Sequence, residues 1–152
     1  DIDHFKSIND NHGHGTGDEA LRQFSQTIQT KIRETDVFGR LGGEEFALLI
    51  TETKPDSLYT AERLRDNIAH IRVDCTDGKI QFTASVGVAH SEPGDTIERL
   101  LRQADQALYR AKELGRNIVV EYKAGDHAGR SGQSLDTPAR IERIESTDPE
   151  PV

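Results

Sequence analysis

The sequence predicts an α+β fold in which helices pack on a mainly antiparallel sheet. Three observations support this class: apolar residues recur at helical spacing in three stretches, alternate in a fourth, and flank a pair of glycines in a fifth. The expected order of elements is strand end, helix, hairpin, helix, strand, helix, strand. The length of 152 residues fits one domain with a sizeable core.

The three helices are predicted from apolar positions that lie three and four residues apart. Their stripes are Leu21, Phe24, Ile28 and Ile32, then Leu58, Ala61, Leu64, Ile68 and Ile71, then Ile97, Leu100, Leu101, Ala104, Leu108 and Ala111. Thr16 and Glu19 have capping-box spacing and are expected to begin the first helix. Pro55 suits the first turn of the second helix, and Gly115 is expected to end the third.

The remaining segments predict strands and turns. Residues 1–3 fit the end of a strand, and the glycine-containing residues 11–18 fit turns. Apolar side chains alternate over residues 80–88 and predict a strand that follows a turn at residues 77–78. A final short strand is expected at residues 118–122.

A hairpin is predicted where Gly42 and Gly43 separate two apolar runs, because both glycines tolerate positive φ. The outgoing run, residues 46–50, is apolar at every position and is expected to be covered on both faces. Glu44 and Glu45 precede this run, where a core strand normally begins with an apolar side chain. Beside a tight glycine turn, which phosphates can approach closely, these two acids indicate a functional site.

The chain is acidic overall, with a formal net charge of -8. A general nucleic-acid or anionic-membrane binder would present a basic face, so both classes are disfavoured. A phosphate ligand remains compatible, because a few cations or a metal can reverse the local field. Cys75 is the single cysteine and permits no internal disulfide. No apolar stretch approaches membrane-spanning length.

The last thirty residues differ in composition from the rest. Gly, Ser, Pro and charged residues dominate residues 123–152, which we expect to be a disordered tail. The predicted domain is therefore residues 1–122.

Three pairs of charged residues stand where predicted elements begin or end. These pairs are Asp1 and Asp3, Glu44 and Glu45, and Lys112 and Arg116. Carboxylates from two strand ends repel one another unless a cation lies between them, and acids without His or Cys ligands favour Mg²⁺ over Zn²⁺. Two nearby cations would neutralise triphosphate oxygens. Together the pairs indicate metal-assisted phosphoryl or nucleotidyl transfer, although each pair alone also fits a solvated turn or a helix C-terminus.

Several short motifs follow one another along the chain. They are Asp1-Ile2-Asp3-His4-Phe5-Lys6, Asn9-Asp10, Gly13-His14, Gly17-Asp18, Gly42-Gly43-Glu44-Glu45-Phe46, and Asp105-Gln106-Ala107-Leu108-Tyr109-Arg110-Ala111-Lys112 with Gly115-Arg116-Asn117. Together they resemble the GGDEF family of diguanylate cyclases from Asp1 to about Tyr122. The resemblance implies a ferredoxin-like palm related to nucleotidyl cyclases and polymerases. It also leads us to expect a piece of a longer protein that lacks the family's first helix and the start of its first strand.

The resemblance implies a reaction and its catalytic residues. Family members condense two GTP into cyclic di-GMP and release two pyrophosphates. Asp1, the backbone carbonyl of Ile2 and Glu44 would hold Mg²⁺, for which Mn²⁺ could substitute. Glu44 would also activate the attacking 3'-hydroxyl, and Glu45 would support the second metal or the hydroxyl. Lys6 would stabilise the charge on the triphosphate in the transition state.

The substrate-binding residues that the resemblance implies are Asn9, His14, Asp18, Gly42, Gly43, Lys112 and Arg116. Asn9 and Asp18 would read the guanine edge, with His14 nearby. The glycines would let the turn lie against the α-phosphate, where a side chain would collide. The two late cations would hold the β- and γ-phosphates.

An RxxD pattern, Arg33 to Asp36, is separated from Gly42 by five intervening residues. In the family this pattern is the inhibitory product site. Arg33 would donate in a fork to a phosphate or a guanine edge, Asp36 would accept from guanine, and Arg63 would add a contact. The alternative is that Arg33 and Asp36 are solvated residues at the ends of their elements.

Four functions are compatible with the sequence. The leading hypothesis is a diguanylate cyclase that acts as a homodimer, with one GTP in each domain and inhibition by cyclic di-GMP. The alternative is a non-catalytic cyclic di-GMP receptor, which the presence of Glu44 and Glu45 disfavours. A third hypothesis keeps the reaction but changes the nucleobase of the substrate, which would give a mixed or an adenine cyclic dinucleotide. Asn9 and Asp18 favour guanine instead. The fourth is an acidic structural scaffold.

The expected setting follows from the leading hypothesis. An upstream sensor or receiver domain is expected in the parent chain, and nucleic acid is not an expected partner. The expected location is cytoplasmic, in a parent protein that an upstream region could anchor to the membrane.

Overall fold

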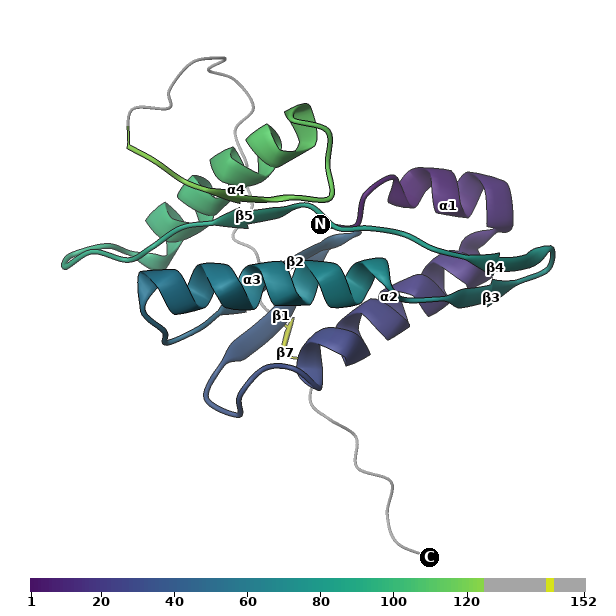
Figure 1. Ribbon diagram of the computed structural model, residues 1–152, viewed down its shortest axis with the longest axis horizontal. Helices are drawn as coiled ribbons and strands as arrows, with labels where there is room; N and C mark the ends of the chain where they lie inside the picture. The colour runs from purple at the N-terminus through teal and green to yellow at the C-terminus, as the bar shows by residue number, and fades with distance from the viewer. Residues whose placement is uncertain (125–141, 144–152) are drawn as a thin grey trace, which may run out of the picture.

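Helices and short strands alternate along the chain (Figure 1). The structure, a computed structural model, describes residues 1–124 and 142–143. Its elements are α1 (Phe5–His12), α2 (His14–Gln29), β1 (Val37–Gly42), β2 (Glu45–Leu49), α3 (Lys54–Ala69), β3 (Val73–Cys75), β4 (Gly78–Ile80), β5 (Val86–Val88), α4 (Ile97–Glu113), β6 (Val119–Glu121) and β7 (Glu142–Arg143).

The strands form three small sheets. β1 lies between β2 and β7 and is antiparallel to both, β3 and β4 form an antiparallel pair, and β5 runs parallel to β6. The opening of the chain joins two of these sheets. The Ile2 amide donates to the Glu44 carbonyl at 3.2 Å, and Ile2 also forms an antiparallel bridge with Ala84. The chain start therefore lies between the hairpin and the segment that leads into β5 (Figure 1).

The core is built from the β1–β2 hairpin, the first three helices and β3. Phe24 of α2 contacts Phe46 of β2, with ring centroids 4.7 Å apart, and Phe46 stacks on Phe38 of β1 at 5.5 Å. Ile2 and Val73 are almost completely buried. α3 lies across the strands (Figure 1). The predicted α+β class, with helices packed on a mainly antiparallel sheet, is confirmed.

The second and third predicted helices are confirmed as α3 and α4. Pro55 lies in the first turn of α3, where its missing N–H is not needed. The Thr96 side chain caps α4 by accepting from the Arg99 amide at 3.3 Å. Gly115, with φ 115°, follows the end of α4 as expected.

The prediction was wrong at the start of the chain, because residues 5–12 form a helix that the sequence pattern does not reveal. The segment is rich in Asn, Asp and His, which have weak helix propensity. Phe5 and Ile8 are nonetheless buried, so tertiary packing supports α1. The expected capping box at Thr16 is also wrong: α2 begins at His14, and the Thr16 hydroxyl donates to the His12 carbonyl at 2.8 Å.

The hairpin turn lies one residue later than predicted. Gly42 pairs with Glu45 across the ladder, so the two turn residues are Gly43 and Glu44. A register shift between Arg40 and Gly42 absorbs the difference. β2 is also less covered than expected, because it is an outer strand of its sheet and Leu49 is 45% exposed.

The later strands are shorter than predicted. The expected strand over residues 80–88 is divided between β4 and β5, and β3 was not predicted at all. The final strand is confirmed as β6. Ile32 lies beyond the end of α2 but still packs against the core.

The predicted disordered tail falls largely outside the described residues. Its described part includes residues 123–124 and β7, which pairs antiparallel with β1. Residues 125–141 and 144–152 lie outside the described part of the chain, so the disorder stays a prediction. Among the helices that the structure describes, none has the length and apolar character needed to cross a membrane.

Candidate functional site

The Asp1 carboxylate and the Lys112 ammonium form the centre of the candidate site. Lys112 Nζ lies 3.0 Å from Asp1 Oδ1. The Asp1 side chain is 5% exposed and the Lys112 side chain 33% exposed, so the pair has one buried and one accessible end. Asp1 and Lys112 come from two of the three charged pairs in the sequence. They lie at opposite ends of the predicted domain in sequence and meet in the fold.

The α-ammonium of Asp1 shares this environment. It donates to the Ser85 carbonyl at 3.1 Å. Burial, followed by the positive charge of Lys112, lowers the pKa of this group from 8.0 to about 6. The negative charges of Asp3, Glu45 and Glu44 act in the opposite direction and raise the same pKa. The hairpin acids are therefore within electrostatic range of the chain start.

The hairpin brings Glu44 to this site through its backbone. The Ile2 amide donates to the Glu44 carbonyl, which fixes the turn beside the chain start. Glu44 is partly buried, whereas Glu45 is exposed. Asp1, Glu44 and the Ile2 carbonyl offer only oxygen donors, which suits Mg²⁺ when phosphates and water complete the coordination. Within residues 1–124 and 142–143, no group of three or more His, Cys, Asp or Glu residues is placed to hold a metal by itself.

The hairpin tip has free space at the position where the family resemblance implies a phosphate. A Cβ added at Gly42 or at Gly43 would touch no other part of the described chain. Gly43 has φ 51°, the left-handed region that glycine adopts readily. Arg40 supports the turn, because its Nε and Nη2 donate to the Gly43 carbonyl at 2.9 and 2.6 Å. Sequence reasoning missed Arg40, which no motif singled out.

Asn9 and Asp18, the expected guanine readers, are brought near one another by the α1–α2 contact. A Cβ at Gly17 would collide with Asn9 Oδ1 and crowd the Phe5 ring. Gly17 therefore leaves room for the Asn9 side chain directly beside Asp18. Asn9 is partly buried and Asp18 is exposed.

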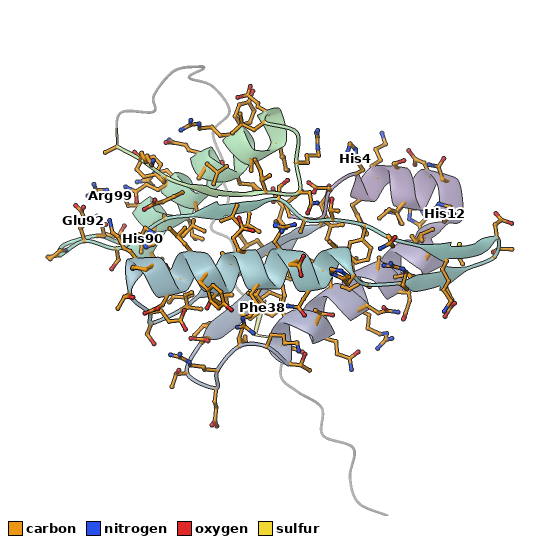
Figure 2. All side chains as sticks on the ribbon, viewed as in Figure 1. His4, His12, Phe38, His90, Glu92 and Arg99 are labelled. Atoms are coloured by element: carbon orange, nitrogen blue, oxygen red, sulfur yellow. The ribbon has the colours of Figure 1, made fainter. Side chains whose placement is uncertain are left out.

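Two further predicted residues lie on accessible parts of the same helices. Lys6 is exposed on the first turn of α1, and His14 is exposed at the start of α2. No hydrogen bond or ion pair of either side chain is described in residues 1–124, so their assigned roles stay predictions. His4 and His12 mark the two ends of α1 in Figure 2.

The Asp3 carboxylate has different hydrogen-bond partners from the Asp1 carboxylate. Its side chain accepts from the Thr83 hydroxyl and the Ser85 hydroxyl, both at 2.7 Å, and from the Asn117 amide at 3.1 Å. The residue is 4% exposed. These donors use the carboxylate internally, so Asp3 organises the site while Asp1 faces Lys112.

Arg116 follows α4 in an unusual backbone conformation. Arg116 and Asn117 have φ values of 67° and 49°, and both are non-glycine residues in the left-handed region. The Arg116 amide donates to the Ala111 carbonyl at 3.0 Å, which closes the helix end. Arg116 therefore lies in the turn that follows α4, whereas Lys112 lies in the last turn of the helix.

The predicted product site lies at the opposite end of β1 from the hairpin tip. Arg33 and Asp36 form a closed turn: the Asp36 carboxylate accepts from the Arg33 amide at 2.8 Å, and the Asp36 amide donates to the Arg33 carbonyl at 3.0 Å. The Arg33 guanidinium lies 3.1 Å from Glu52. Arg63 of α3 donates to the Lys31 carbonyl at 3.1 Å. All three predicted product-site residues therefore lie around the C-terminal end of α2.

Comparison with known proteins assigns the family. The family described as "Diguanylate cyclase, GGDEF domain" matches residues 1–118. Diguanylate cyclase DgcM of Escherichia coli K12 is 44% identical over 121 residues, which cover 79% of this chain and 29% of DgcM. The response regulator PleD of Caulobacter vibrioides is 43% identical over 124 residues, covering 79% of this chain and 27% of PleD. The chain thus spans less than a third of the length of these relatives.

Solved structures share the fold. Diguanylate cyclase SiaD of Pseudomonas aeruginosa, solved with its activator SiaC, superimposes with a TM-score of 0.76 at 38% identity, covering 80% of this chain and 47% of SiaD. The GGDEF domain of DgcB from Caulobacter crescentus, solved with c-di-GMP, gives a TM-score of 0.76 at 34% identity over 80% of this chain and 74% of that domain. This chain belongs to the GGDEF domain family of diguanylate cyclases.

Proposed function

We propose that this domain is a diguanylate cyclase, which condenses two GTP into cyclic di-GMP and two pyrophosphates. The observation that carries the proposal is the meeting of Asp1, Lys112 and the hairpin acids at one site. An acidic group for a divalent ion and a cation for a leaving phosphate are the two parts that nucleotidyl transfer requires. A receptor that only binds cyclic di-GMP would not need them together.

The chain's own residues account for the main steps. The bound Mg²⁺, or Mn²⁺ in its place, would neutralise phosphate charge and polarise the attacking oxygen. Asp1, the Ile2 carbonyl and Glu44 would hold the ion. Glu44 would accept the proton of the 3'-hydroxyl, supported by Glu45. The open glycine tip of the hairpin leaves space for the α-phosphate.

The leaving group needs positive charge. In each transfer a bond forms between the 3'-oxygen and the α-phosphorus, and the bond from that phosphorus to the β-phosphate oxygen breaks. Lys112 and Arg116 would hold the departing pyrophosphate, and Lys6 would stabilise charge in the transition state. With the Asp1 carboxylate holding the ion, Lys112 would be released from its ion pair with Asp1 and could bind phosphate. Positioning and charge neutralisation supply most of the rate.

Base recognition and assembly complete the proposal. Asn9 and Asp18 would read the guanine edge, with His14 nearby. Each domain would hold one GTP, so ring closure requires two domains face to face, and a strict monomer would bind GTP without closing the ring. The relatives with activator or response-regulator names support an upstream regulatory domain in the parent chain.

Product inhibition is proposed for the RxxD turn. Asp36 Oδ1 makes no hydrogen bond within the described residues but is buried, so the carboxylate would turn outward to accept from guanine. The Arg33 side chain is 67% exposed and can reach a phosphate. Arg63 lies on the neighbouring helix and would add a contact. The c-di-GMP complex of the DgcB domain supports cyclic di-GMP as the ligand.

The test is product chromatography after incubation with GTP and Mg²⁺. The wild-type chain, extended upstream with parent residues, should yield cyclic di-GMP. Glu44→Gln should lower the rate at least about 100-fold, because it removes a metal ligand and the base. Glu92→Gln changes an exposed glutamate in the distant loop after β5 (Figure 2) and should leave the rate unchanged. Normal synthesis by Glu44→Gln would refute the assignment, and a mixed product from GTP plus ATP would favour the altered-base hypothesis.

A further inference from the structure

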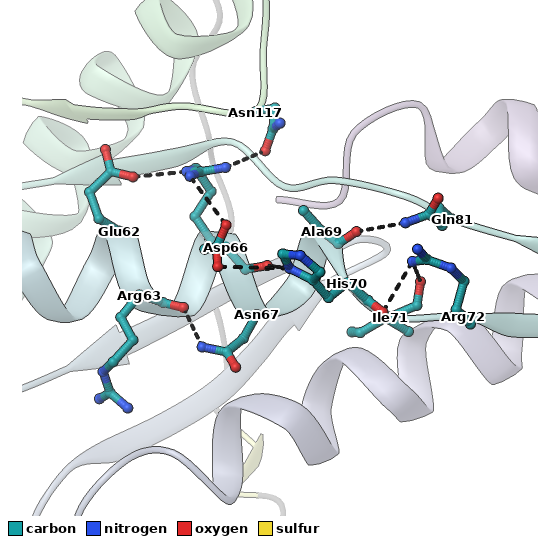
Figure 3. Close-up of polar contacts among 11 residues, drawn as sticks. Glu62, Arg63, Asp66, Asn67, Ala69, His70, Ile71, Arg72, Gln81 and Asn117 are labelled. Carbon is teal, nitrogen blue, oxygen red and sulfur yellow. Dashed lines mark hydrogen bonds and ion pairs between the residues drawn. The ribbon is translucent and has the colours of Figure 1, made fainter.

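Arg65 of α3 takes part in a polar network that connects α3 to Asn117 and, through Asn117, to Asp3. Its Nη1 donates to Asn117 Oδ1 at 2.8 Å, and its Nε lies 2.8 Å from Glu62. The Arg65 side chain is 19% exposed, so solvent screens these contacts only in part. The dashed lines that end on Asn117 and Glu62 in Figure 3 mark this network.

Asn117 is held from two sides. Its side chain accepts from Arg65, while its backbone amide donates to Asp3 Oδ2 at 3.1 Å. Asp3 in turn accepts from Thr83 and Ser85. Asn117 therefore connects α3, the chain start and the segment before β5, which lie far apart in the sequence.

The backbone at this point needs such support. Arg116 and Asn117 are consecutive non-glycine residues with φ of 67° and 49°. Residues other than glycine are disfavoured in this region, Asn less than most, and two consecutive residues with this conformation persist where surrounding contacts hold them. The contacts from Arg65 and Asp3 both converge on Asn117, the second of the two residues.

We infer that Arg65 and Asp3 are positioning residues that hold the Arg116–Asn117 turn, and through it the triphosphate grip of Lys112 and Arg116. The inference rests on the proposed function for its ligand. Lys112 lies in the last turn of α4, whereas Arg116 lies in the turn that follows, so the direction in which the chain leaves α4 sets where Arg116 lies relative to Lys112. Arg65 touches neither the metal ligands nor either of these cations in the described contacts, so its effect on substrate is indirect.

The first experiment examines the free protein by amide hydrogen exchange. Arg65→Gln should raise the exchange rate of the Asn117 amide roughly tenfold, as expected when one hydrogen bond to a charged group is lost. Arg65→Lys keeps a cationic donor and should restore part of the protection. Arg22→Gln removes an ion pair from exposed α2 and is the matched control, with no expected change. Equal exchange in Arg65→Gln and wild type would overturn the inference.

A glycine variant separates the side-chain contact from the backbone strain. Asn117→Gly loses the Arg65 contact but adopts positive φ freely. Asn117→Ala loses the contact and keeps the strain. We expect Asn117→Gly to protect the Arg116 amide better than Asn117→Ala does. Greater protection in the alanine variant would contradict a strained turn that needs external support.

The second experiment measures binding of GTP and GMP by calorimetry with Mg²⁺. Arg65→Gln should weaken GTP binding roughly tenfold and leave GMP binding within about twofold, because GMP lacks the β- and γ-phosphates. A general structural role would weaken both nucleotides equally, and that result would overturn the inference. If the wild type binds neither nucleotide, the proposed function fails, while the exchange experiment still decides whether Arg65 restrains the turn.

Discussion

The candidate catalytic site and the RxxD turn are built in opposite ways. The catalytic site joins the chain start, the hairpin and the end of α4, and its Asp1 side chain is 5% exposed. The RxxD turn closes within four residues, and its Arg33 side chain is 67% exposed. The first depends on how distant elements pack, whereas the second depends mainly on its own backbone.

This difference teaches where each site is vulnerable. A change that moves α4 or β5 should disturb the catalytic site and leave the RxxD turn in place. A change in the turn should affect its ligand and little else. Substitutions in each region can test that separation.

Gly87→Ala should have the largest effect. A Cβ at Gly87 would run into the Ala104 carbonyl and the Leu108 amide, which are backbone atoms of α4 and cannot turn aside. We expect a loss of about 3 kcal/mol in the free energy of unfolding, measured by urea denaturation. Gly15→Ala is the control, since open space surrounds Gly15 in the described chain, and it should be neutral or stabilising by about 0.5–1 kcal/mol. An unchanged Gly87→Ala protein would mean that α4 is not held against β5 at this point.

Gly17→Ala should change binding more than stability. The atom in its way is Asn9 Oδ1, the end of a side chain, so Asn9 can rotate instead of the helices separating. If Asn9 reads guanine, GTP affinity should fall roughly tenfold, the value of about one good hydrogen bond. Calorimetry with GTP would measure it, and Gly15→Ala again serves as control. An unchanged affinity would remove Asn9 from the guanine site.

The α-ammonium of Asp1 predicts a pH dependence of stability for the 152-residue chain. Its pKa is lowered from 8.0 to about 6 in the fold, first by burial and then by Lys112. Between these values the unfolded chain binds more protons than the folded one, so the free energy of unfolding should rise with pH from about 6 to 8. The full gain, present above pH 8 and lost below pH 6, is about 2–3 kcal/mol.

Urea denaturation with EDTA at several pH values would measure this slope. An N-acetylated chain lacks the titrating group and serves as the control, because its histidines titrate as before. The slope of the unmodified chain should exceed that of the acetylated chain between about pH 6 and 8. Equal slopes would show that the ammonium stays solvated.

Arg33→Ala should have the smallest effect on fold and initial rate. Its ion pair with Glu52 has one mostly exposed partner, so the loss of stability should stay below about 1 kcal/mol. The initial rate of synthesis should be unchanged, while inhibition by added cyclic di-GMP should be relieved. Progress curves with and without added product would show both. A lower initial rate would mean that the two sites are coupled.

The sequence predicted the features that repeat or cluster along the chain. Apolar stripes located α3 and α4, and the paired glycines located the hairpin to within one residue. Asp1, Glu44 and Lys112 belong to short motifs of the sequence, although nothing in the sequence shows that they lie close together. Apolar stripes, the glycine pair and the family motifs all consist of residues close together in the sequence, so they can be recognised without coordinates.

Contacts between distant segments could not be predicted in the same way. α1 is supported by the burial of Phe5 and Ile8. Two apolar residues in an otherwise polar segment are too few to predict this helix from the sequence. The Arg65–Asn117 and Asp3–Asn117 contacts span 52 and 114 residues. No periodicity encodes such pairs, since each depends on how elements fold back on one another.

The Arg40 contact determines how the hairpin can move. Arg40 grips the Gly43 carbonyl and also lies over the Phe46 ring, with its guanidinium carbon 5.9 Å from the ring centroid. Phe46 in turn packs against Phe24 and Phe38. These contacts connect the hairpin tip to the aromatic cluster that packs the hairpin against α2. We therefore expect a shift of α2 to be accompanied by a shift of the acids at the tip.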